Sequence, residues 1–406
     1  MDDLTPQCNS SSQEYPCRYR NPDDQGTQYA LIIIPVFLGV TTVLTITLIL
    51  WKTCCRKWEQ ERAPIASLQD KPVSSESGYV AMAAVEHTLL PVRDPGLRQW
   101  EIPGDTAIED LEFLRSGRFG PVCRAKLTQG GSSTAVVIKT LRDNSTTSKA
   151  KEFVNWIRFC ARVCCHDNLV KMMFCQTELW PMYLIMEACS PGNLLHLLWE
   201  LRKSDGESVD QVHEFSETSV YCIGKQVLAG LDYLASEQKL IHGDVAARNV
   251  LINSRLGVKI SGLSLAFEVQ QTGCVSSRSA AVVPVKWLAP ERIMKLPMTV
   301  KSDIWSFGIL LYELITLGSP PYPELKPLDT FPKLQHYYRM KRPDHCGAPL
   351  YDLMKHCWMW LPQDRPSFSA VIKHLDSYMY LAETKMICNK ESMNMNQYSL
   401  IAGVVL

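Results

Sequence analysis

The chain has 406 residues and is 46% hydrophobic, which is enough for a globular core and for more than one domain. Its 42 Lys and Arg residues balance 42 Asp and Glu residues, and the charge therefore gives no reason to expect a nucleic acid as a partner. Of its 15 cysteines only Cys8 and Cys17 precede residue 50, so most of the chain is expected to be reduced and cytosolic.

Residues 30–50 are predicted to form a transmembrane helix, because they are apolar and carry no charge. A helix rises about 1.5 Å per residue, so this run matches a hydrocarbon core of ~30 Å. Lys52, Arg56 and Lys57 follow it closely, and the positive-inside rule therefore places the C-terminal side in the cytosol. We expect a single-pass protein in the lipid membrane, most simply the plasma membrane.

Residues 1–29 form the predicted extracellular segment, which is too short to bury a core of its own. Asn9 begins an Asn-Ser-Ser glycosylation acceptor. Cys8 and Cys17 leave two pairings open, one within the segment and one across a dimer.

Residues 51–107 are predicted to be a juxtamembrane linker, because they contain several prolines and no sustained helix or strand period. Cys54 and Cys55 lie at the membrane edge, where they are either palmitoylation sites or inert thiols. Tyr79 begins a Tyr-x-x-Met pattern, which resembles a docking motif for phosphotyrosine-binding adaptors.

Residues 242–249 read His-Gly-Asp-Val-Ala-Ala-Arg-Asn and resemble the catalytic loop of tyrosine kinases. The resemblance extends over 108–383 and implies the α+β bilobal protein kinase fold. Its mostly β N-lobe would cover 108–187 and its mostly α C-lobe 188–383. It also implies ATP and magnesium as cofactors and proteins as substrates. By this resemblance Asp244 and Arg248 are catalytic residues, and Asn249 is both catalytic and a magnesium ligand.

Three further segments resemble the nucleotide side of a kinase. Residues 114–122 are similar to the glycine-rich loop, Val136–Lys139 to the strand that carries the phosphate-binding lysine, and residues 186–189 to the gatekeeper and hinge. The resemblance implies these nucleotide-binding residues: Leu114, Gly117, Phe119, Gly120, Val122, Lys139, Glu187 and Cys189.

The chain departs from the kinase pattern at positions that serve phosphate, metal or activation. Gly262 stands where the family has the aspartate that holds magnesium. Gly243 replaces an arginine that in many kinases pairs with a phosphorylated loop residue, and Arg115 replaces the first glycine of the glycine-rich loop. The glutamate that pairs with the lysine is expected on or near Trp156, and Glu152, about one turn earlier, is the nearest carboxylate.

Positions with structural roles are kept. By the resemblance, Glu291 and Arg365 form a buried ion pair and Asp303 braces the catalytic loop. The tail, 384–406, contains Tyr398 in a Tyr-x-x-apolar pattern that suits sorting or phosphotyrosine docking, although we expect an unstructured end.

Two functions remain open. The first is a membrane-anchored tyrosine kinase that transfers the γ-phosphate weakly if at all, because the metal-binding aspartate is missing. The alternative is a pseudokinase that signals as a scaffold or allosteric partner. A purely structural role fits less well, since Asp244 and Lys139 match the catalytic pattern.

Overall fold

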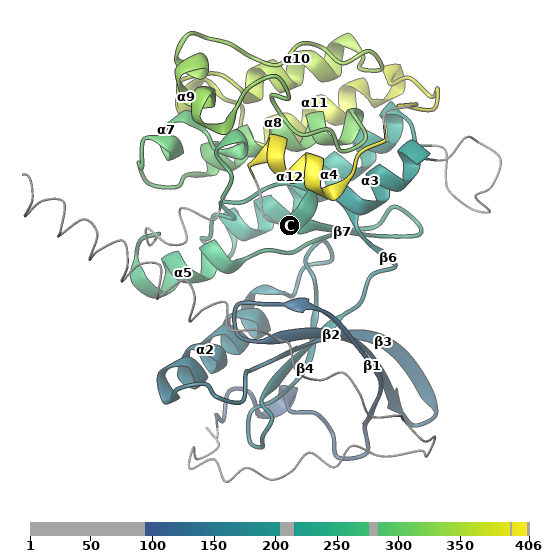
Figure 1. Cartoon of the computed structure of the whole chain (residues 1–406), viewed down its shortest axis with the longest axis vertical. Coiled ribbons are helices and arrows are strands. Elements are labelled where there is room, and N and C mark those ends of the chain that lie inside the picture. The colour runs from purple at the N-terminus through teal and green to yellow at the C-terminus, as the bar shows by residue number, and fades with distance from the viewer. Residues whose placement is uncertain (1–93, 204–214, 276–282, 390–391, 404–406) are drawn as a thin grey trace, which may run out of the picture. The chain divides into compact units, whose positions relative to one another are not determined.

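The computed structural model describes residues 94–203, 215–275, 283–389 and 392–403. The predicted segments 1–29 and 30–50, and most of the linker 51–107 with Tyr79, lie outside these residues. Within the described part, no helix has the length and apolar character to cross a membrane. The described residues form one compact unit with two lobes (Figure 1).

The N-lobe is built on a five-stranded sheet with the order β1-β2-β3-β5-β4. The strands are β1 (Ala107–Ser116), β2 (Pro121–Gln129), β3 (Ser132–Thr140), β4 (Met172–Gln176) and β5 (Tyr183–Glu187). All neighbouring strands pair antiparallel, and alternate residues of β2 are buried, as expected for a sheet with one covered face.

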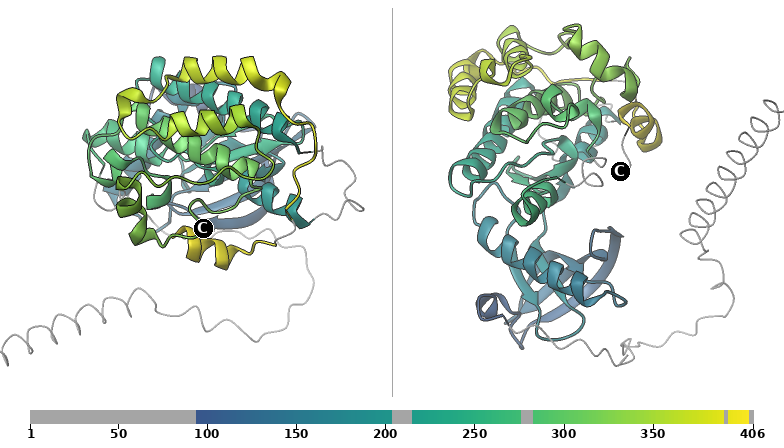
Figure 2. Two further views of the ribbon diagram at one scale, coloured as in Figure 1. Left: turned by 90° about the horizontal axis from the view of Figure 1, so that it is seen from above. Right: turned by 90° about the vertical axis from the view of Figure 1, so that its left-hand side faces the viewer.

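The one long helix described in the N-lobe is α2 (Thr147–Val163), which packs beside the sheet (Figure 2). Thr146 begins it because its side chain accepts a hydrogen bond from the Lys149 N–H. Apolar residues recur along one face, and those that the structure buries include Phe153, Trp156 and Phe159. The same face therefore points aromatic rings toward the boundary between the lobes.

The C-lobe is mostly helical. Its helices are α3 (Leu194–Lys203), α4 (Glu217–Ser236), α5 (Ser264–Thr272), α7 (Pro290–Ile293), α8 (Val300–Ile315), α9 (Pro327–Gln335), α10 (Ala348–Cys357), α11 (Phe368–Tyr378) and α12 (Met395–Ala402). A small sheet contains β6 (Pro191–Asn193), β7 (Val250–Asn253) and β8 (Val258–Ile260). Short 3-10 turns of this lobe are η2 (Ala247–Asn249), η3 (Val285–Trp287), η4 (Pro362–Asp364) and η5 (Met379–Leu381), whereas η1 (Arg98–Trp100) lies beside β4 in the N-lobe. This architecture confirms the predicted bilobal fold.

Helix α8 is the centre of the C-lobe, with most of its residues buried. The expected ion pair is present beside it: both guanidinium nitrogens of Arg365 donate to the Glu291 carboxylate, at 2.7 and 2.8 Å. Arg365 also lies over the Trp305 ring, 5.1 Å from its centroid.

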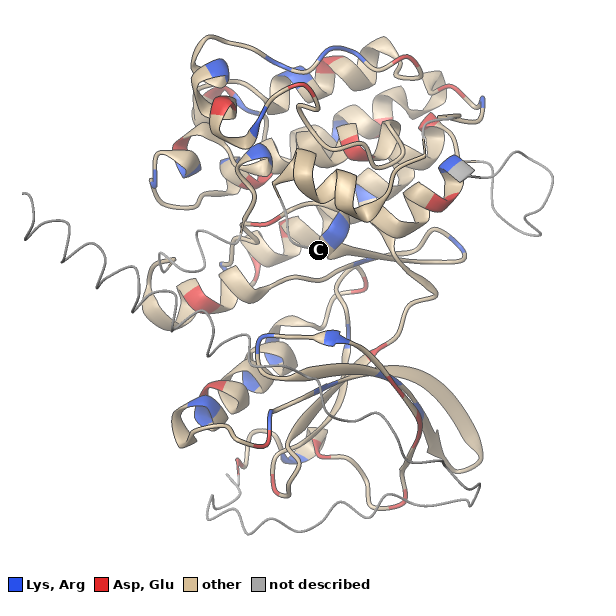
Figure 3. Ribbon diagram, in the orientation of Figure 1, with Lys and Arg blue, Asp and Glu red and all other residues tan. Residues whose placement is uncertain are grey.

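Positive and negative residues are interspersed over both lobes in the view of Figure 3.

The expectation of an unstructured C-terminal end is wrong. Met395–Ala402 form helix α12, whose N-terminus is capped by the Asn394 side chain on the Gln397 N–H (2.7 Å). An isolated helix of this length is marginal in water, so local sequence alone does not predict it. Tertiary packing of Tyr398, whose side chain is fully buried, supplies the missing stability.

Candidate functional site

Asp303, at the start of α8, braces the loop 242–249. Its two carboxylate oxygens accept hydrogen bonds from the backbone N–H groups of His242 (2.8 Å) and Gly243 (2.9 Å). Burial raises the pKa of Asp303, and these two N–H groups oppose that rise by favouring the charged form. The predicted brace is therefore present.

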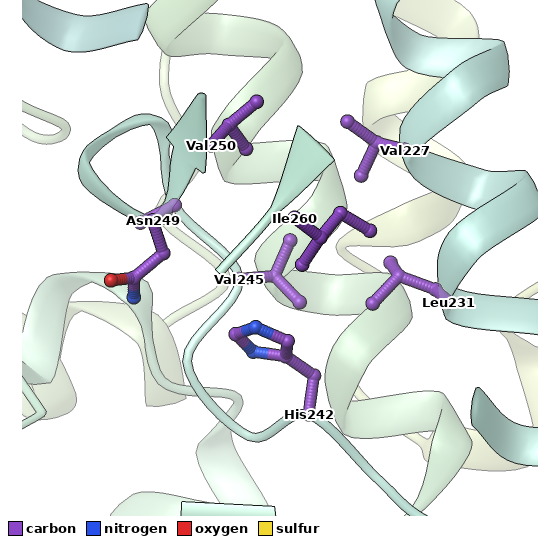
Figure 4. Close-up of a pocket in the computed structure, with 8 residues that line it drawn as sticks. Val227, Leu231, His242, Val245, Asn249, Val250 and Ile260 are labelled. Carbon is purple, nitrogen blue, oxygen red and sulfur yellow. The ribbon is translucent and has the colours of Figure 1, made fainter. Parts of the chain in front are cut away.

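His242 ties this loop to the segment before Gly262. Its Nε2 donates to the Ser261 carbonyl oxygen at 2.8 Å, while its Nδ1 accepts from the Asp244 N–H at 3.2 Å. Figure 4 shows the small space behind the loop, lined by Val227, Leu231, Val245, Val250 and Ile260, with His242 against it. The space leaves no room for a water molecule, so it belongs to the packing of the lobe and not to a ligand site.

The three predicted catalytic residues lie together and bind one another. Arg248 forms an ion pair with Asp244 through Oδ1. The Asn249 side-chain amide donates to Asp244 Oδ2 at 2.7 Å and to the Asp244 carbonyl at 2.8 Å. Both oxygens of the one carboxylate in this triad are thus already hydrogen-bonded, and the Asn249 amide is used inside the loop.

Gly262 lies directly against the Asn249 side chain. A Cβ atom added at Gly262 would stand 2.6 Å from Asn249 Cγ and 2.7 Å from its Oδ1, and real Cβ atoms do not approach so closely. The backbone at Gly262 has φ of +84°, in the left-handed region that disfavours other residues. The Asn249 amide therefore fills the space into which an aspartate at 262 would project.

Gly243 also has positive φ, +78°, and a Cβ there would meet the Met298 sulfur at 2.5 Å. The arginine found here in many kinases would require Met298 to move. The Met298 side chain therefore occupies the space that a side chain at position 243 would enter.

Lys139 faces a tryptophan ring where a kinase has a glutamate. Its Nζ lies 6.0 Å from the centroid of the Trp156 ring, at the limit of a cation–π contact. Among the residues that the structure describes, no carboxylate forms an ion pair with Lys139. Burial lowers the pKa of Lys139, and only the weakly acidic thiols of Cys160 and Cys164 oppose this. Trp156 therefore lies beside Lys139, at the position where the glutamate partner was expected.

Glu152, the nearest carboxylate in sequence, is engaged elsewhere. It accepts a hydrogen bond from the Arg118 guanidinium of the glycine-rich loop at 2.7 Å. This pair is well exposed and contributes little to stability by itself. It nevertheless removes Glu152 from the set of groups available to Lys139.

An aromatic cluster joins the two lobes at this point, and we define it as Phe119, Phe153, Trp156, Phe159 and Phe267. Phe267, on α5, contacts Trp156 and Phe159 of α2 edge-on, with ring centroids 5.1 and 5.4 Å apart. Phe119 of the glycine-rich loop packs on Phe153 at 5.1 Å. Three segments that surround the nucleotide site in kinases are thereby packed on one another.

The glycine-rich loop is folded onto the end of β3. The Gly117 N–H donates to the Gly120 carbonyl at 2.7 Å, and the Arg142 N–H donates to the Phe119 carbonyl at 3.1 Å. A Cβ at Gly120 would stand 2.4 Å from the Thr140 carbonyl oxygen. The close approach at Gly120 therefore serves protein backbone in this structure.

The remaining predicted nucleotide residues are spread around the lobe boundary. Val122 is buried in β2, whereas Leu114 on β1 is exposed. Glu187 ends β5, where its carboxylate pairs with Lys259 at 2.9 Å and accepts from the Lys171 N–H at 2.7 Å. Cys189 follows it, and burial raises the pKa of its thiol.

The residues present keep only part of the magnesium site of a kinase, because Gly262 carries no carboxylate. Neither Ser261 nor Ser264 offers one, and Mg²⁺ is usually bound through one or two carboxylates together with phosphate oxygens. No group of three or more His, Cys, Asp or Glu side chains in the described ranges is arranged to hold a metal ion.

Three features of this site were missed by the sequence analysis. No local pattern indicates that the Asn249 side chain binds Asp244 and fills the space beside Gly262. Aromatic residues on one face of 147–163 indicate part of the aromatic cluster, but nothing around Phe267 indicates that it packs on that face. The buried contact of Tyr398 was also missed, because the pattern around it reads as an exposed motif.

A two-lobed fold, a catalytic loop braced by Asp303 and a glycine-rich loop in the N-lobe define the class of a protein kinase. A model of the family described as protein tyrosine and serine/threonine kinase matches residues 108–375, and the chain belongs to that family. The chain is 36% identical to the tyrosine-protein kinase STYK1 of Homo sapiens over 396 residues, covering 94% of this chain and 93% of that protein.

Receptors are also among the relatives. The chain is 31% identical to the tyrosine kinase receptor Cad96Ca of Drosophila melanogaster, covering 75% of this chain and 40% of the receptor. It is 33% identical to fibroblast growth factor receptor 1 of Xenopus laevis, covering 81% of this chain and 42% of that receptor. The match to these receptors thus involves less than half of their length.

Proposed function

We propose that this protein is a membrane-anchored signalling protein of the tyrosine kinase type that transfers the ATP γ-phosphate to protein tyrosine weakly if at all. Residues 1–29 would be extracellular, 30–50 would span the membrane, and 51–107 would link the span to the cytoplasmic kinase-like domain, 108–383. Residues 384–406 would form a C-terminal tail. The proposal places the protein at the plasma membrane.

One observation carries the proposal: Gly262 has no carboxylate, and the Asn249 amide fills the space that one would enter. In the family, that carboxylate holds the magnesium that neutralises charge on the transferred phosphoryl group. Its loss removes several kcal/mol of transition-state stabilisation, and each ~1.36 kcal/mol is tenfold in rate. We expect a deficit of roughly a hundredfold to ten-thousandfold.

The surroundings of Lys139 support the same proposal. The lysine keeps a place from which it would contact the α- and β-phosphates, but it has Trp156 beside it instead of a carboxylate. Desolvation without an ion-pair partner disfavours its charged form. The lysine is therefore a poorer phosphate ligand than in a standard kinase.

The proposed roles of the other residues follow the family. Asp244 would orient the substrate hydroxyl with Arg248 beside it, and Asn249 would be the remaining metal ligand once its amide turned away from Asp244. The proposed nucleotide-binding residues are Leu114, Gly117, Phe119, Gly120, Val122, Lys139, Glu187 and Cys189.

The alternative function is a pseudokinase that acts as a scaffold, and the aromatic cluster favours it. Phe267 on α5 and Phe119 on the glycine-rich loop both pack against α2, which would hold the lobes in one arrangement without nucleotide. Signalling adaptors recruited through Tyr79, and a dimer joined through Cys8 or Cys17, would be the partners of such a scaffold.

The test is phosphotyrosine formation by the purified full-length chain with ATP and Mg²⁺ or Mn²⁺. The wild type is compared with Asp244→Asn, which keeps the size of the side chain but removes the carboxylate. We expect a weak signal that the substitution abolishes. Equal signals from both proteins would refute catalysis by this chain and leave the scaffold.

Nucleotide binding is measured in parallel by thermal shift with ATP, with and without the metal. A ligand that binds only the folded state raises the melting temperature by mass action. A shift that appears with ATP alone and does not grow with Mg²⁺ is expected from the missing carboxylate. No shift with ATP would exclude the nucleotide-binding role proposed for Lys139.

A further inference from the structure

The C-terminal helix α12 is seated on the C-lobe mainly by one side chain. Of its eight residues only Tyr398 and Ala402 are buried, and Tyr398 has an exposed fraction of 0%. Leu400, two residues later, is 80% exposed. Figures 1 and 2 show α12 at the surface of the C-lobe, away from the N-lobe sheet. Helix α12 is thus a surface element that is anchored to the C-lobe mainly by Tyr398, with Ala402 as its second buried residue.

The tyrosine occupies a site built by three parts of the C-lobe. Its ring meets Trp199 of α3 edge-on with centroids 5.0 Å apart, and it lies 6.4 Å from the Trp287 ring of η3. Its hydroxyl donates to Glu313 Oε1 of α8 at 3.2 Å. A cleft of about 440 Å³ remains between α3 and Ser392–Met395, so the chain just before α12 is not packed down.

Glu313 connects this site to the catalytic loop. Its other oxygen, Oε2, accepts from the Ala247 N–H and from Trp287 Nε1, each at 3.0 Å. Ala247 begins η2, which presents the predicted catalytic residues Arg248 and Asn249. Arg248 in turn lies over the Trp287 ring, 4.7 Å from its centroid. The tail and the catalytic loop therefore share one buried carboxylate and one tryptophan.

A phosphate on Tyr398 is incompatible with this seat. It would bring about −1.5 to −2 charges and three oxygens into a site with no solvent contact, directly beside the Glu313 carboxylate. Arg248, the cation whose charge acts on Tyr398, pairs with Asp244 through one of its nitrogens, and its single charge would offset only part of that of the phosphate. The undocked tail, in contrast, would present Tyr398 on a segment too short to stay helical alone.

We propose that α12 is a detachable latch on the C-lobe and that Tyr398 is a phosphorylation site which can be modified only when the latch is open. The donor is ATP bound to a partner tyrosine kinase. The phenolic oxygen forms a bond to the γ-phosphorus, the bond from that phosphorus to ADP breaks, and the phenolic proton passes to the partner's catalytic base. The phosphorylated tail cannot reseat, and the Glu313 carboxylate loses its contact with Tyr398.

The inference is independent of whether this chain transfers phosphate itself, because the partner supplies the catalysis. The buried position of Tyr398 also determines when the Tyr-x-x-apolar pattern is accessible to a binding partner. In the seated state the motif is hidden, so an adaptor would bind it only after the latch opens.

The test treats the full-length chain with an active tyrosine kinase and Mg²⁺-ATP, and follows phosphate at Tyr398 by mass spectrometry. A peptide of residues 392–406 serves as the open reference. We expect Tyr398 in the wild type to react roughly tenfold to a hundredfold more slowly than in the peptide, the shift expected from burial of one aromatic side chain. Equal rates would overturn the latch.

A latch-opening variant, Ala402→Glu, places a charge on the second buried residue of α12, and the same change in the peptide controls for recognition by the kinase. The variant should react at nearly the rate of its peptide. Trp199→Ala, which opens the seat without altering the tail, should do the same. If either folded variant keeps the slow wild-type rate, Tyr398 is not held by this seat.

The second readout is hydrogen exchange at the Ala247 amide, whose acceptor is Glu313. Exchange should quicken after phosphorylation and in Ala402→Glu, while Tyr398→Phe, which cannot accept phosphate, should resist the kinase treatment. Unchanged exchange at Ala247 in the phosphorylated protein would refute the connection to the catalytic loop. If neither the open variants nor the peptides accept phosphate, Tyr398 is not a modification site.

Discussion

Restoring a carboxylate by Gly262→Asp is expected to strain the site before it creates a metal ligand. The new Cβ would lie 2.6 Å from Asn249 Cγ, so the Asn249 side chain must turn away and give up its hydrogen bonds of 2.7 and 2.8 Å to Asp244. The substituted residue must also adopt φ near +84°. The new carboxylate and Asp244 are like charges in the same small site.

The magnitude follows from these terms. A left-handed backbone costs a residue other than glycine roughly 1–2 kcal/mol, and each hydrogen bond lost contributes about 0.5–1.5 kcal/mol. Without ligand, we therefore expect a loss of roughly 2–5 kcal/mol in the free energy of unfolding. In a thermal melt this corresponds to a fall of several degrees.

Gly262→Ala is the matched control, because it adds the same Cβ and meets the same backbone restriction without a carboxylate. Both variants should melt below the wild type when no ligand is present. With ATP and Mg²⁺, only Gly262→Asp should recover, since only it gains an oxygen ligand for the cation. An unchanged melting temperature in both variants, or an equal response of both to Mg²⁺, would refute the reasoning.

Three further outcomes are expected. Trp156→Ala removes the centre of the aromatic cluster and should lower the free energy of unfolding by about 3–5 kcal/mol, measured by urea titration. The control Trp156→Tyr keeps an aromatic ring and should retain most of that free energy. Arg365→Ala leaves the buried Glu291 carboxylate unpaired and should cost about 3–5 kcal/mol, far more than loss of an exposed arginine. Burial lowers the pKa of Lys286 to about 8, below its ordinary value of 10.5, so the unfolded chain binds more protons between these values. Stability should therefore rise by about 3 kcal/mol from pH 8 to 10.5 through this group, and Lys286→Met should remove that rise; the same slope in both proteins would contradict it.

The sequence by itself determined the fold and showed that the metal-binding carboxylate of a kinase is missing. Motifs such as residues 242–249 and the pair of Glu291 with Arg365 depend on residue type and spacing along the chain, and the structure places them as expected. The replacement of a carboxylate by Gly262 is likewise a property of composition. No tertiary structure is needed to conclude that glycine offers no side-chain oxygen ligand to a metal.

Only the tertiary structure decided what occupies the vacated positions. Asn249 fills the space beside Gly262, and Trp156 takes the place beside Lys139, because close packing brings in whichever side chain the neighbouring element presents. Phe267 reaches α2 for the same reason. These contacts join segments about 13 to 110 residues apart in the chain, and the periodicity of a local segment does not identify its partner in space.

The tail illustrates the limit most clearly. Residues around Tyr398 have weak helical preference and read as an exposed motif, yet Trp199, Trp287 and Glu313 bury the tyrosine completely. The stability of α12 comes from that seat, which is assembled from three helical segments distant in sequence. Local sequence therefore determined what the chain had lost relative to a kinase, whereas long-range packing determined what the remaining residues now contact.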